Sequence, residues 1–259
     1  MLDNSILEDL SIYSEEFTLG YGSTACLLIH GLGCGPIQMR ELAEYLCKWG
    51  FTARGILLPG HCGEDIDSLE LISGHDWREK VEYEYQQLKE EYENVVVIGF
   101  SLGALLTLQL AMKYPIEKII LMSTPVFIVH EYMPLNGLID LFRIFVRRLK
   151  TIKKTCYMET DGYAGYLYQP VESYYSLQTI SEINQMIETI KPRLKEVKSS
   201  ALVIHSKKDL TATPSSARYV VKHLSSAEKQ LIWLDRSHHL MMYGNEKKVV
   251  FNAVKEFLK

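Results

Sequence analysis

Short runs of apolar residues alternate with longer segments of helical periodicity along most of the chain. The runs cover Ala25–His30, Phe51–Leu58, Val95–Phe100, Lys118–Ser123, Ala201–His205 and Gln230–Leu234. Most are apolar at consecutive positions, which is typical of parallel strands covered by helices on both faces. The alternation predicts an α/β fold in which βα units build a mostly parallel central sheet flanked by helices. A short segment over Phe17–Leu19 is expected to add an edge strand.

Helical segments separate these runs, and two of them end at recognisable signals. We predict helices over Gln38–Trp49, Asp76–Tyr92, Leu102–Lys113 and Lys247–Leu258. Gly50 follows the first helix, and glycine readily adopts the left-handed conformation that ends helices. Pro115 comes shortly after the third helix, and proline cannot continue a helix.

One long interval, between Ser123 and Lys198, contains no strong strand pattern. It contains two apolar stripes at helical spacing instead. Their members are Leu138, Leu141, Phe142, Phe145 and Leu149 in the first, and Leu177, Ile180, Ile183, Ile187 and Ile190 in the second. Pro192 is expected to end or kink the second helix. The pattern predicts a small helical cap over residues 125–195, inserted after the sixth strand into a core formed by residues 1–124 and 196–259.

A G-x-S-x-G motif occurs at Gly99-Phe100-Ser101-Leu102-Gly103. A buried-strand pattern precedes it and a helical pattern follows, which is the strand–turn–helix setting of a nucleophile elbow. The sharp turn lifts the serine side chain above the sheet, and the glycines let neighbouring backbone pass without a Cβ clash. Ser101 is therefore the candidate nucleophile. An incidental serine in a glycine-rich turn is the alternative.

A serine hydroxyl needs a base to remove its proton and an acid to orient that base. In this type of fold the acid follows the serine along the chain and the histidine comes last. Asp209 follows the fifth apolar run and Asp235 follows the sixth, so both are candidate acids, with Asp209 in the favoured position. His238 and His239 come next, and adjacent residues cannot both point at Ser101. Sequence position alone leaves the two histidines open.

The segment His30-Gly31-Leu32-Gly33 ends the first long strand run and has the H-G-x-G form. Its expected contribution is the backbone N–H of Leu32, which would form an oxyanion hole together with the N–H of Leu102. Leu102 is expected at a helix N-terminus, where negative charge is stabilised. His30 is interpreted as a structural histidine that braces the loop, because both expected donors are backbone groups.

Taken together, these motifs resemble those of the bacterial carboxylesterase and monoacylglycerol lipase family of the α/β-hydrolase superfamily. The resemblance rests on H-G-L-G at 30–33, L-P-G-H at 58–61, G-F-S-L-G at 99–103, the late Asp209 and the Ser-x-His at 237–239. It extends from about Phe17 to Leu258 and implies an α/β-hydrolase fold with a short cap. It also implies that Ser101 is the nucleophile, that His239 is its base and that Asp209 orients the base.

The chain departs from the family pattern in two places. The family's Ser-Gly-His reads Ser237-His238-His239 here, so His238 replaces a glycine. The family's L-x-G-H-G has one additional residue before its last glycine, within Leu58–Gly63. We expect these changes to alter the local geometry beside His239 and at the border of the pocket.

Composition narrows the partners that the chain can have. The net charge of −4 gives no basic footprint, so nucleic acid is not an expected partner. No metal or other cofactor is expected, because there is no HExxH motif, Cys/His ligand cluster or glycine-rich phosphate loop. The acidic N-terminus and the lack of a long apolar run favour a cytoplasmic location. The five cysteines are scattered and are expected to be free thiols.

Two features of the predicted cap bear on its role. Six of its tyrosines are Tyr157, Tyr163, Tyr166, Tyr168, Tyr174 and Tyr175. Tyrosines suit a broad apolar pocket with occasional hydrogen bonds, or else the packing of the cap onto the core. The segment Leu138–Lys154 is also basic and would suit weak contact with an anionic lipid surface, with a solvated outer face as the alternative.

Three functions remain open on this reasoning. The first is hydrolysis of short- to medium-chain acyl esters or monoacylglycerols through an acyl-enzyme intermediate. The second is another acyl-transfer activity of the same fold, that of a thioesterase, amidase or acyltransferase, because each begins with acyl transfer to the serine. The third is a non-catalytic binding protein with the same fold, which the presence of all three triad candidates disfavours.

Overall fold

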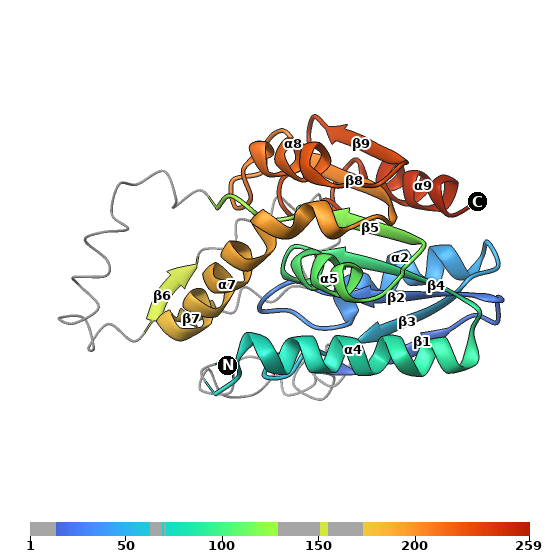
Figure 1. The fold of residues 1–259 in the computed structure, drawn as a ribbon, viewed down its shortest axis with the longest axis horizontal. Helices are drawn as coiled ribbons and strands as arrows, with labels where there is room; N and C mark the ends of the chain where they lie inside the picture. Colours follow the sequence, from blue (N-terminus) through green and yellow to red (C-terminus); the bar gives the residue numbers. More distant parts are fainter. Residues whose placement is uncertain (1–13, 63–68, 70, 129–150, 155–172) are drawn as a thin grey trace, which may run out of the picture.

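The computed structural model describes residues 14–62, 69, 71–128, 151–154 and 173–259. Its strands in the main sheet are β1 (Phe17–Leu19), β2 (Thr24–Ile29), β3 (Thr52–Ile56), β4 (Asn94–Phe100), β5 (Lys118–Met122), β8 (Ser200–Ser206) and β9 (Lys229–Leu234). They form one seven-stranded sheet in the order β1-β3-β2-β4-β5-β8-β9 (Figure 1). Strand β1 is antiparallel to β3, and all other neighbours are parallel. The predicted mostly parallel sheet and its edge strand are therefore confirmed.

The helices are α2 (Ile37–Cys47), α4 (Gly74–Glu91), α5 (Leu102–Lys113), α7 (Leu177–Ile190), α8 (Pro214–His223) and α9 (Lys247–Leu258). Helices α5 and α9 have the predicted bounds, and α2 and α4 lie close to theirs. Helix α8 was not predicted. Its buried face consists of Ser216, Ala217 and Val220, and such small or polar residues give only a weak apolar stripe.

The two faces of the sheet are covered by different helices. Successive residues of a strand point to opposite faces. In β2, Leu27 packs in a cluster with residues of α4, α5, α7 and α8, whereas Leu28 packs in a second cluster with residues of α2 and α9. Both leucines are fully buried. The strand runs are therefore continuously apolar because helices cover both alternating sets of side chains.

The chain leaves the sheet after β5 and returns to it at β8. Helix α7 lies in this interval, and a 3-10 helix with Pro192 in its first turn (Lys191–Glu196) follows it, so the second predicted cap helix and its end are confirmed. Five strands of the sheet precede the interval in the described chain, and the order of helices agrees with the predicted cap. Helix α7 packs against the core through Ile183, Met186, Ile187 and Ile190.

The interval also contains a separate antiparallel pair of strands, β6 (Thr151–Lys154) and β7 (Ser173–Ser176). The sequence pattern indicated no strong strand here, because four residues are too few to establish a clear alternation. The first predicted apolar stripe, over Leu138–Leu149, lies outside the described residues. The boundaries of the cap, at 125 and 195, therefore stay a prediction.

Two further observations come from the described part of the chain. None of its helices is long and apolar enough to cross a membrane. Of its cysteines, Cys26 and Cys47 are free thiols, while Cys156 lies outside the described residues.

Candidate active site

Ser101 occupies a strained turn between β4 and α5. Its backbone has φ 53° and ψ −113°, a conformation that residues other than glycine rarely adopt. Hydrogen bonds hold the turn on both sides. The N–H of Ser101 donates to Met122 O at 2.9 Å, and the carbonyl of Ser101 accepts from Ala104 N–H at 2.9 Å. The motif therefore has the strand–turn–helix geometry that its sequence predicts.

Close backbone packing explains both glycines of the motif. A Cβ on Gly99 would lie 2.2 Å from Gly103 O, and a Cβ on Gly103 would lie 2.2 Å from Ile29 O. Neither distance is compatible with ordinary van der Waals contact. A Cβ on Gly103 would also lie 2.8 Å from His30 O. The turn at Ser101 is thus packed directly against the end of β2 and the loop that follows it.

Asp209 and His239 lie beside Ser101 although they are distant from it in sequence. His239 Nε2 lies 3.0 Å from Ser101 Oγ, and His239 Nδ1 lies 2.8 Å from Asp209 Oδ2. An ionised carboxylate only accepts hydrogen bonds, so Nδ1 carries the ring proton and Nε2 can accept from the serine hydroxyl. The three side chains follow β4, β8 and β9, at the carboxyl ends of parallel strands where open α/β sheets place their sites.

Asp209 is buried, and both of its carboxylate oxygens have hydrogen-bond partners. Oδ1 accepts from the backbone N–H of Thr211 at 2.8 Å and of Ala212 at 2.9 Å, while Oδ2 faces His239. Burial raises the pKa of Asp209, but the neighbouring histidine and the N–H donors lower it by more, so the pKa lies below its ordinary value. Asp209 is therefore a carboxylate at neutral pH and can stabilise a positive charge on His239.

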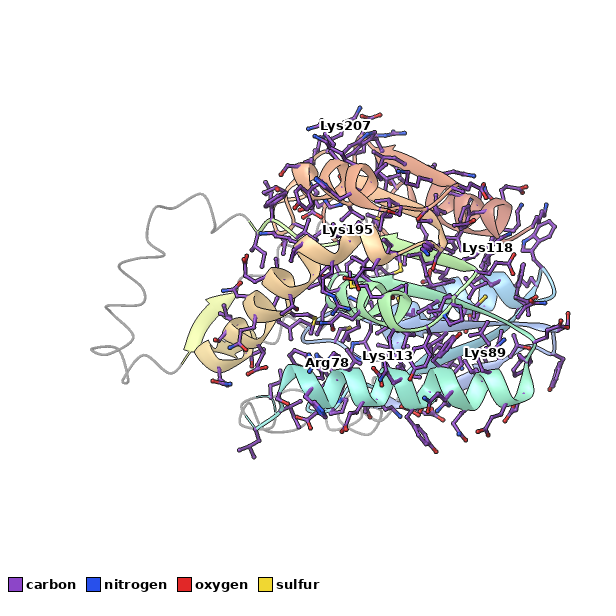
Figure 2. All side chains as sticks on the ribbon, in the orientation of Figure 1. Arg78, Lys89, Lys113, Lys118, Lys195 and Lys207 are labelled. Carbon is purple, nitrogen blue, oxygen red and sulfur yellow. The ribbon has the colours of Figure 1, made fainter. Side chains whose placement is uncertain are left out.

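The two competing residues have other partners. His238 Nδ1 lies 3.1 Å from Lys208 O. The exposed carboxylate of Asp235 pairs with Lys207 Nζ at 2.6 Å, at the edge of the molecule where Figure 2 labels this lysine. The structure thus brings His239 and Asp209 to Ser101, and it places His238 and Asp235 in other contacts.

His30 braces the loop that follows β2. Its Nε2 accepts from Leu58 N–H at 3.0 Å, and its Nδ1–H donates to Gly31 O at 2.8 Å. The N–H of Gly31 donates to Gln38 Oε1 at 2.7 Å, which ties the loop to α2. Burial, with a smaller contribution from the nearby His61, lowers the pKa of His30 to about 3. The ring is therefore neutral at neutral pH, and its contacts agree with the structural role expected of it.

Leu32 and Leu102 are the two residues predicted to form the oxyanion hole. Leu102 is the first residue of α5 and directly follows Ser101. The first N–H groups of a helix have no carbonyl partner within that helix. Leu32 lies in the loop after β2, which is packed against the turn at Ser101. Their role as donors to an oxyanion stays a prediction.

Two buried polar residues near the site were not singled out from the sequence. His205, in β8, has Nε2 at 3.0 Å from Ala212 O and at 3.6 Å from Asp209 Oδ2. Glu246, immediately before α9, accepts hydrogen bonds from the loop that carries His239. No motif marks either position. His205 looks like the end of an apolar run, and Glu246 looks like a surface carboxylate beside a helix.

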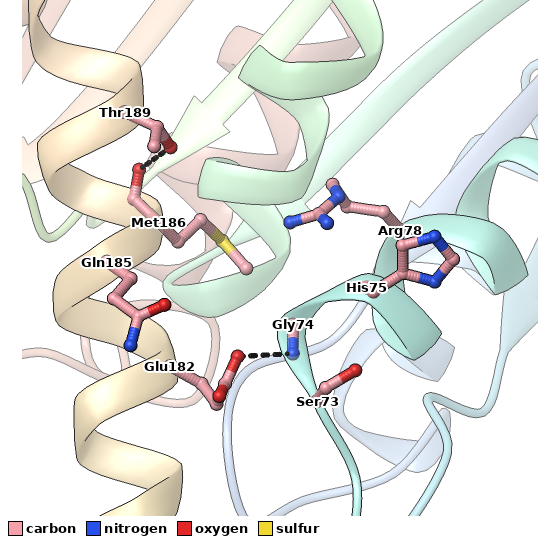
Figure 3. Close-up of a pocket in the computed structure, with 8 residues that line it drawn as sticks. All are labelled: Ser73, Gly74, His75, Arg78, Glu182, Gln185, Met186 and Thr189. Carbon is pink, nitrogen blue, oxygen red and sulfur yellow. Dashed lines mark hydrogen bonds between the residues drawn. The ribbon is translucent and has the colours of Figure 1, made fainter.

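A cavity of about 270 Å³ lies between α4 and α7, away from the residues above (Figure 3). Its lining residues are Ser73, Gly74, His75, Arg78, Glu182, Gln185, Met186 and Thr189. Glu182 Oε2 accepts from Gly74 N–H there at 2.9 Å, which links the two helices. Neither Ser101 nor any residue in contact with it contributes to this cavity.

One side-chain group in the described chain has the spacing to share a cation: His75, Asp76 and Glu79. The carboxylate of Asp76 already accepts from the N–H and the hydroxyl of Ser73, both at 2.7 Å, as part of the cap of α4. These residues are not in contact with Ser101.

The parallel sheet, the strained serine turn and the hydrogen-bonded serine, histidine and aspartate define the α/β-hydrolase class of proteins. Residues 23–248 match the family Hydrolase_4, described as serine aminopeptidase, S33. The chain therefore belongs to this family of serine hydrolases.

Curated relatives match the chain over nearly its whole length. A carboxylesterase of Bacillus subtilis (strain 168) is 26% identical over 247 residues, which is 95% of this chain and 96% of the relative. A thermostable monoacylglycerol lipase of Bacillus sp. (strain H-257) is 27% identical over 249 residues, 94% of each chain. A solved structure from the metagenome-derived lipolytic enzymes LipS and LipT has a TM-score of 0.80 at 21% identity and covers 95% of this chain and 97% of that one.

Proposed function

We propose that the protein is a carboxylic ester hydrolase that acts on short- to medium-chain acyl esters or monoacylglycerols through Ser101, His239 and Asp209. The observation that carries the proposal is the pair of contacts on His239, 3.0 Å to the serine hydroxyl and 2.8 Å to the aspartate. The ester class is supported by the two Bacillus relatives, which are a carboxylesterase and a monoacylglycerol lipase.

The reaction has two halves. In the first, His239 Nε2 takes the proton of Ser101 Oγ as this oxygen attacks the ester carbonyl carbon. The tetrahedral oxyanion then collapses, and the imidazolium gives its proton to the departing alkoxide. The alcohol departs, and the acyl group stays bonded to Ser101 Oγ. In the second half, His239 takes a proton from water as the water oxygen attacks the acyl carbon. The bond from this carbon to Ser101 Oγ then breaks, His239 returns the proton to Ser101 Oγ, and the carboxylic acid leaves. Asp209 stays ionised and stabilises the imidazolium in both halves.

The backbone N–H groups of Leu32 and Leu102 are the proposed donors to the oxyanion. Removing one such donor from a hydrolase costs about 2.7–4 kcal/mol of transition-state stabilisation. The strained conformation of Ser101 sets the direction of the peptide that carries the Leu102 N–H. The strain is thus useful, because it presents the nucleophile and an oxyanion donor on adjacent residues of one turn.

The acyl group is proposed to meet the segment 125–195, which we expect to act as a cap over the core. Its basic stretch, over Leu138–Lys154, is further proposed to give weak contact with anionic lipid surfaces. Co-sedimentation with anionic vesicles at low salt tests this contact. A protein that stays in the supernatant under those conditions would refute it.

A second candidate activity follows from the family description, which names an aminopeptidase. Amide, thioester and ester hydrolysis all begin with attack by the same serine, so the triad geometry does not separate them. Parallel assays with an ester, a thioester and an amide of the same acyl group will distinguish them. A higher kcat/KM for the amide than for the ester would refute the proposed ester hydrolase.

Covalent labelling tests the nucleophile itself. A fluorophosphonate probe is expected to label the wild-type protein, because an activated serine attacks its phosphorus and displaces fluoride. Ser101→Ala should abolish labelling, and mutation of the exposed Ser225 to Ala should not. A wild-type protein that fails to label would refute the proposed mechanism. A series of nitrophenyl esters and monoacylglycerols of increasing chain length then defines the acyl preference.

A further inference from the structure

The buried carboxylate of Glu246 accepts several hydrogen bonds from the loop that carries His239. The loop runs from the end of β9 to the start of α9, and Glu246 at its far end is only 8% exposed. Glu246 Oε1 accepts from Asp235 N–H at 3.1 Å. Glu246 Oε2 accepts from Arg236 N–H at 2.9 Å, and from both the N–H and the hydroxyl of Ser237 at 2.7 Å. Three successive backbone N–H groups and one hydroxyl thus converge on one side chain.

The same loop is held on its other side by Ser206, the last residue of β8, and by Ser123, which directly follows β5. Ser206 Oγ donates to Ser237 O, and Ser123 Oγ donates to His239 O at 3.0 Å. The backbones of Ser237 and His239, the two neighbours of His238, are therefore both held by hydrogen bonds. Glu246 supplies these bonds from one direction, and the serines at the ends of β5 and β8 supply them from the other. This leaves little freedom for the backbone of His239.

We propose that Glu246 is a positioning residue. As an anion, it holds the loop that carries His239 in the position in which His239 Nε2 can accept a hydrogen bond from Ser101 Oγ. This inference rests on the proposed function, in which His239 is the base. Glu246 is the residue immediately before α9, so its side chain can act as a fixed anchor for a segment that has no regular structure of its own. Charge-assisted hydrogen bonds from backbone N–H groups are stronger than neutral ones, which suits this task.

The chemistry of the contact requires the ionised form. A carboxylate accepts hydrogen bonds at both oxygens, whereas an amide has one accepting oxygen and one donating NH2 group. Burial alone would raise the pKa of Glu246, but the hydroxyl and N–H donors outweigh it and lower the pKa to about 2. The anchor is therefore charged at any pH at which the enzyme is expected to work.

Glu246→Gln keeps the size of the side chain and removes its charge, so one backbone N–H must face an NH2 group. The matched control is Glu256→Gln, which removes an exposed carboxylate of α9 that pairs with Lys255 and Lys259. Three assays are applied to each variant. Steady-state rates with a nitrophenyl ester give kcat and KM, a fluorophosphonate probe gives the concentration of reactive sites and their labelling rate, and thermal unfolding gives its midpoint.

Per reactive site, Glu246→Gln is expected to lower kcat and the labelling rate by about 10- to 100-fold, because a misplacement of about 1 Å at reacting groups has an effect of this size. KM is expected to change little, since the proposed ester pocket is not touched. Glu256→Gln should retain the wild-type kcat. Glu246→Asp keeps the charge on a shorter side chain and should recover part of the loss.

A wild-type kcat per reactive site in Glu246→Gln would overturn the inference, even if that variant unfolds at a lower temperature. Should Glu246→Gln fail to fold, Ser237→Ala replaces it, because it removes one of the four hydrogen bonds and leaves the anion in place. A folded Ser237→Ala protein with unchanged kcat would then overturn the inference. A wild-type protein that neither labels nor hydrolyses esters would refute the proposed function, and this inference with it.

Discussion

Adding one methyl group at position 99 would test the close packing beneath the nucleophile turn. The Cβ of Gly99→Ala would lie 2.2 Å from Gly103 O and 2.4 Å from Thr107 Oγ1, whereas ordinary contact begins at 3.4 Å. The end of β4 and the first turn of α5 must therefore separate by about 1 Å. The hydroxyl of Thr107 can rotate away, but the backbone oxygen of Gly103 cannot.

The expected cost falls on both stability and activity. Overpacking costs about 1–3 kcal/mol in ordinary cores, and we expect about 3 kcal/mol here because the obstacle is backbone. Ser101 lies two residues further along the chain and shares the turn. A shift of about 1 Å would lengthen its 3.0 Å contact with His239 beyond hydrogen-bonding distance and reduce kcat by about 10²-fold.

Urea denaturation and initial rates with a nitrophenyl ester measure the two effects separately. Gly50→Ala is the matched control, since Gly50 has φ 85° and no atom within 4 Å of its missing Cβ. It should lose about 1–2 kcal/mol from backbone strain alone and keep the wild-type kcat. The reasoning is refuted if Gly99→Ala keeps its kcat, or if both variants lose activity equally.

Two further predictions concern the charged and titratable groups. Asp209→Asn is expected to lower kcat by about 10³- to 10⁴-fold, because an amide can stabilise the wrong tautomer of His239. The control variant Asp235→Asn removes only a surface ion pair, which is worth at most about 1 kcal/mol of stability, and it should leave kcat unchanged. Burial lowers the pKa of His30 to about 3 and of His61 to about 4, below the ordinary value of 6.5. The unfolded chain therefore binds protons below pH 6.5 that the folded chain does not, so stability should fall as the pH drops from 6.5 to 4. Equal urea midpoints at pH 7 and pH 4.5 would contradict this.

The site residues that could be predicted from the sequence are those that follow a predicted strand and have a chemical type suited to catalysis. Ser101 and Asp209 each follow an apolar run, and the order of the chemical types along the chain is itself informative. The choice between His238 and His239 depended on the resemblance to a known family. The pattern of apolar and polar residues does not indicate which of two adjacent loop residues faces Ser101. In the structure, the contact of His238 with Lys208 O and that of His239 with Ser101 distinguish the two.

The features that the sequence analysis missed depend on contacts between segments that come together only when the chain folds. Glu246 has the sequence surroundings of an exposed helix-start carboxylate, and its burial arises only when the loop from Asp235 folds back over it. His205 is similar, since its contact with Asp209 requires the turn after β8. The pair β6–β7 was missed because each strand is too short to show alternation, and its pairing joins segments far apart in the chain.

The packing of α7 has a consequence for how variants of this protein arise or can be engineered. Ile187 and Ile190 of this helix share one apolar cluster with α4 and α5, so α7 is part of the interior that the sheet depends on. An exchange of α7 with the helix of a relative would have to match a whole buried face. Recombination between relatives should therefore succeed less often when the crossover point falls within α7 than when α7 is kept whole with α4 and α5.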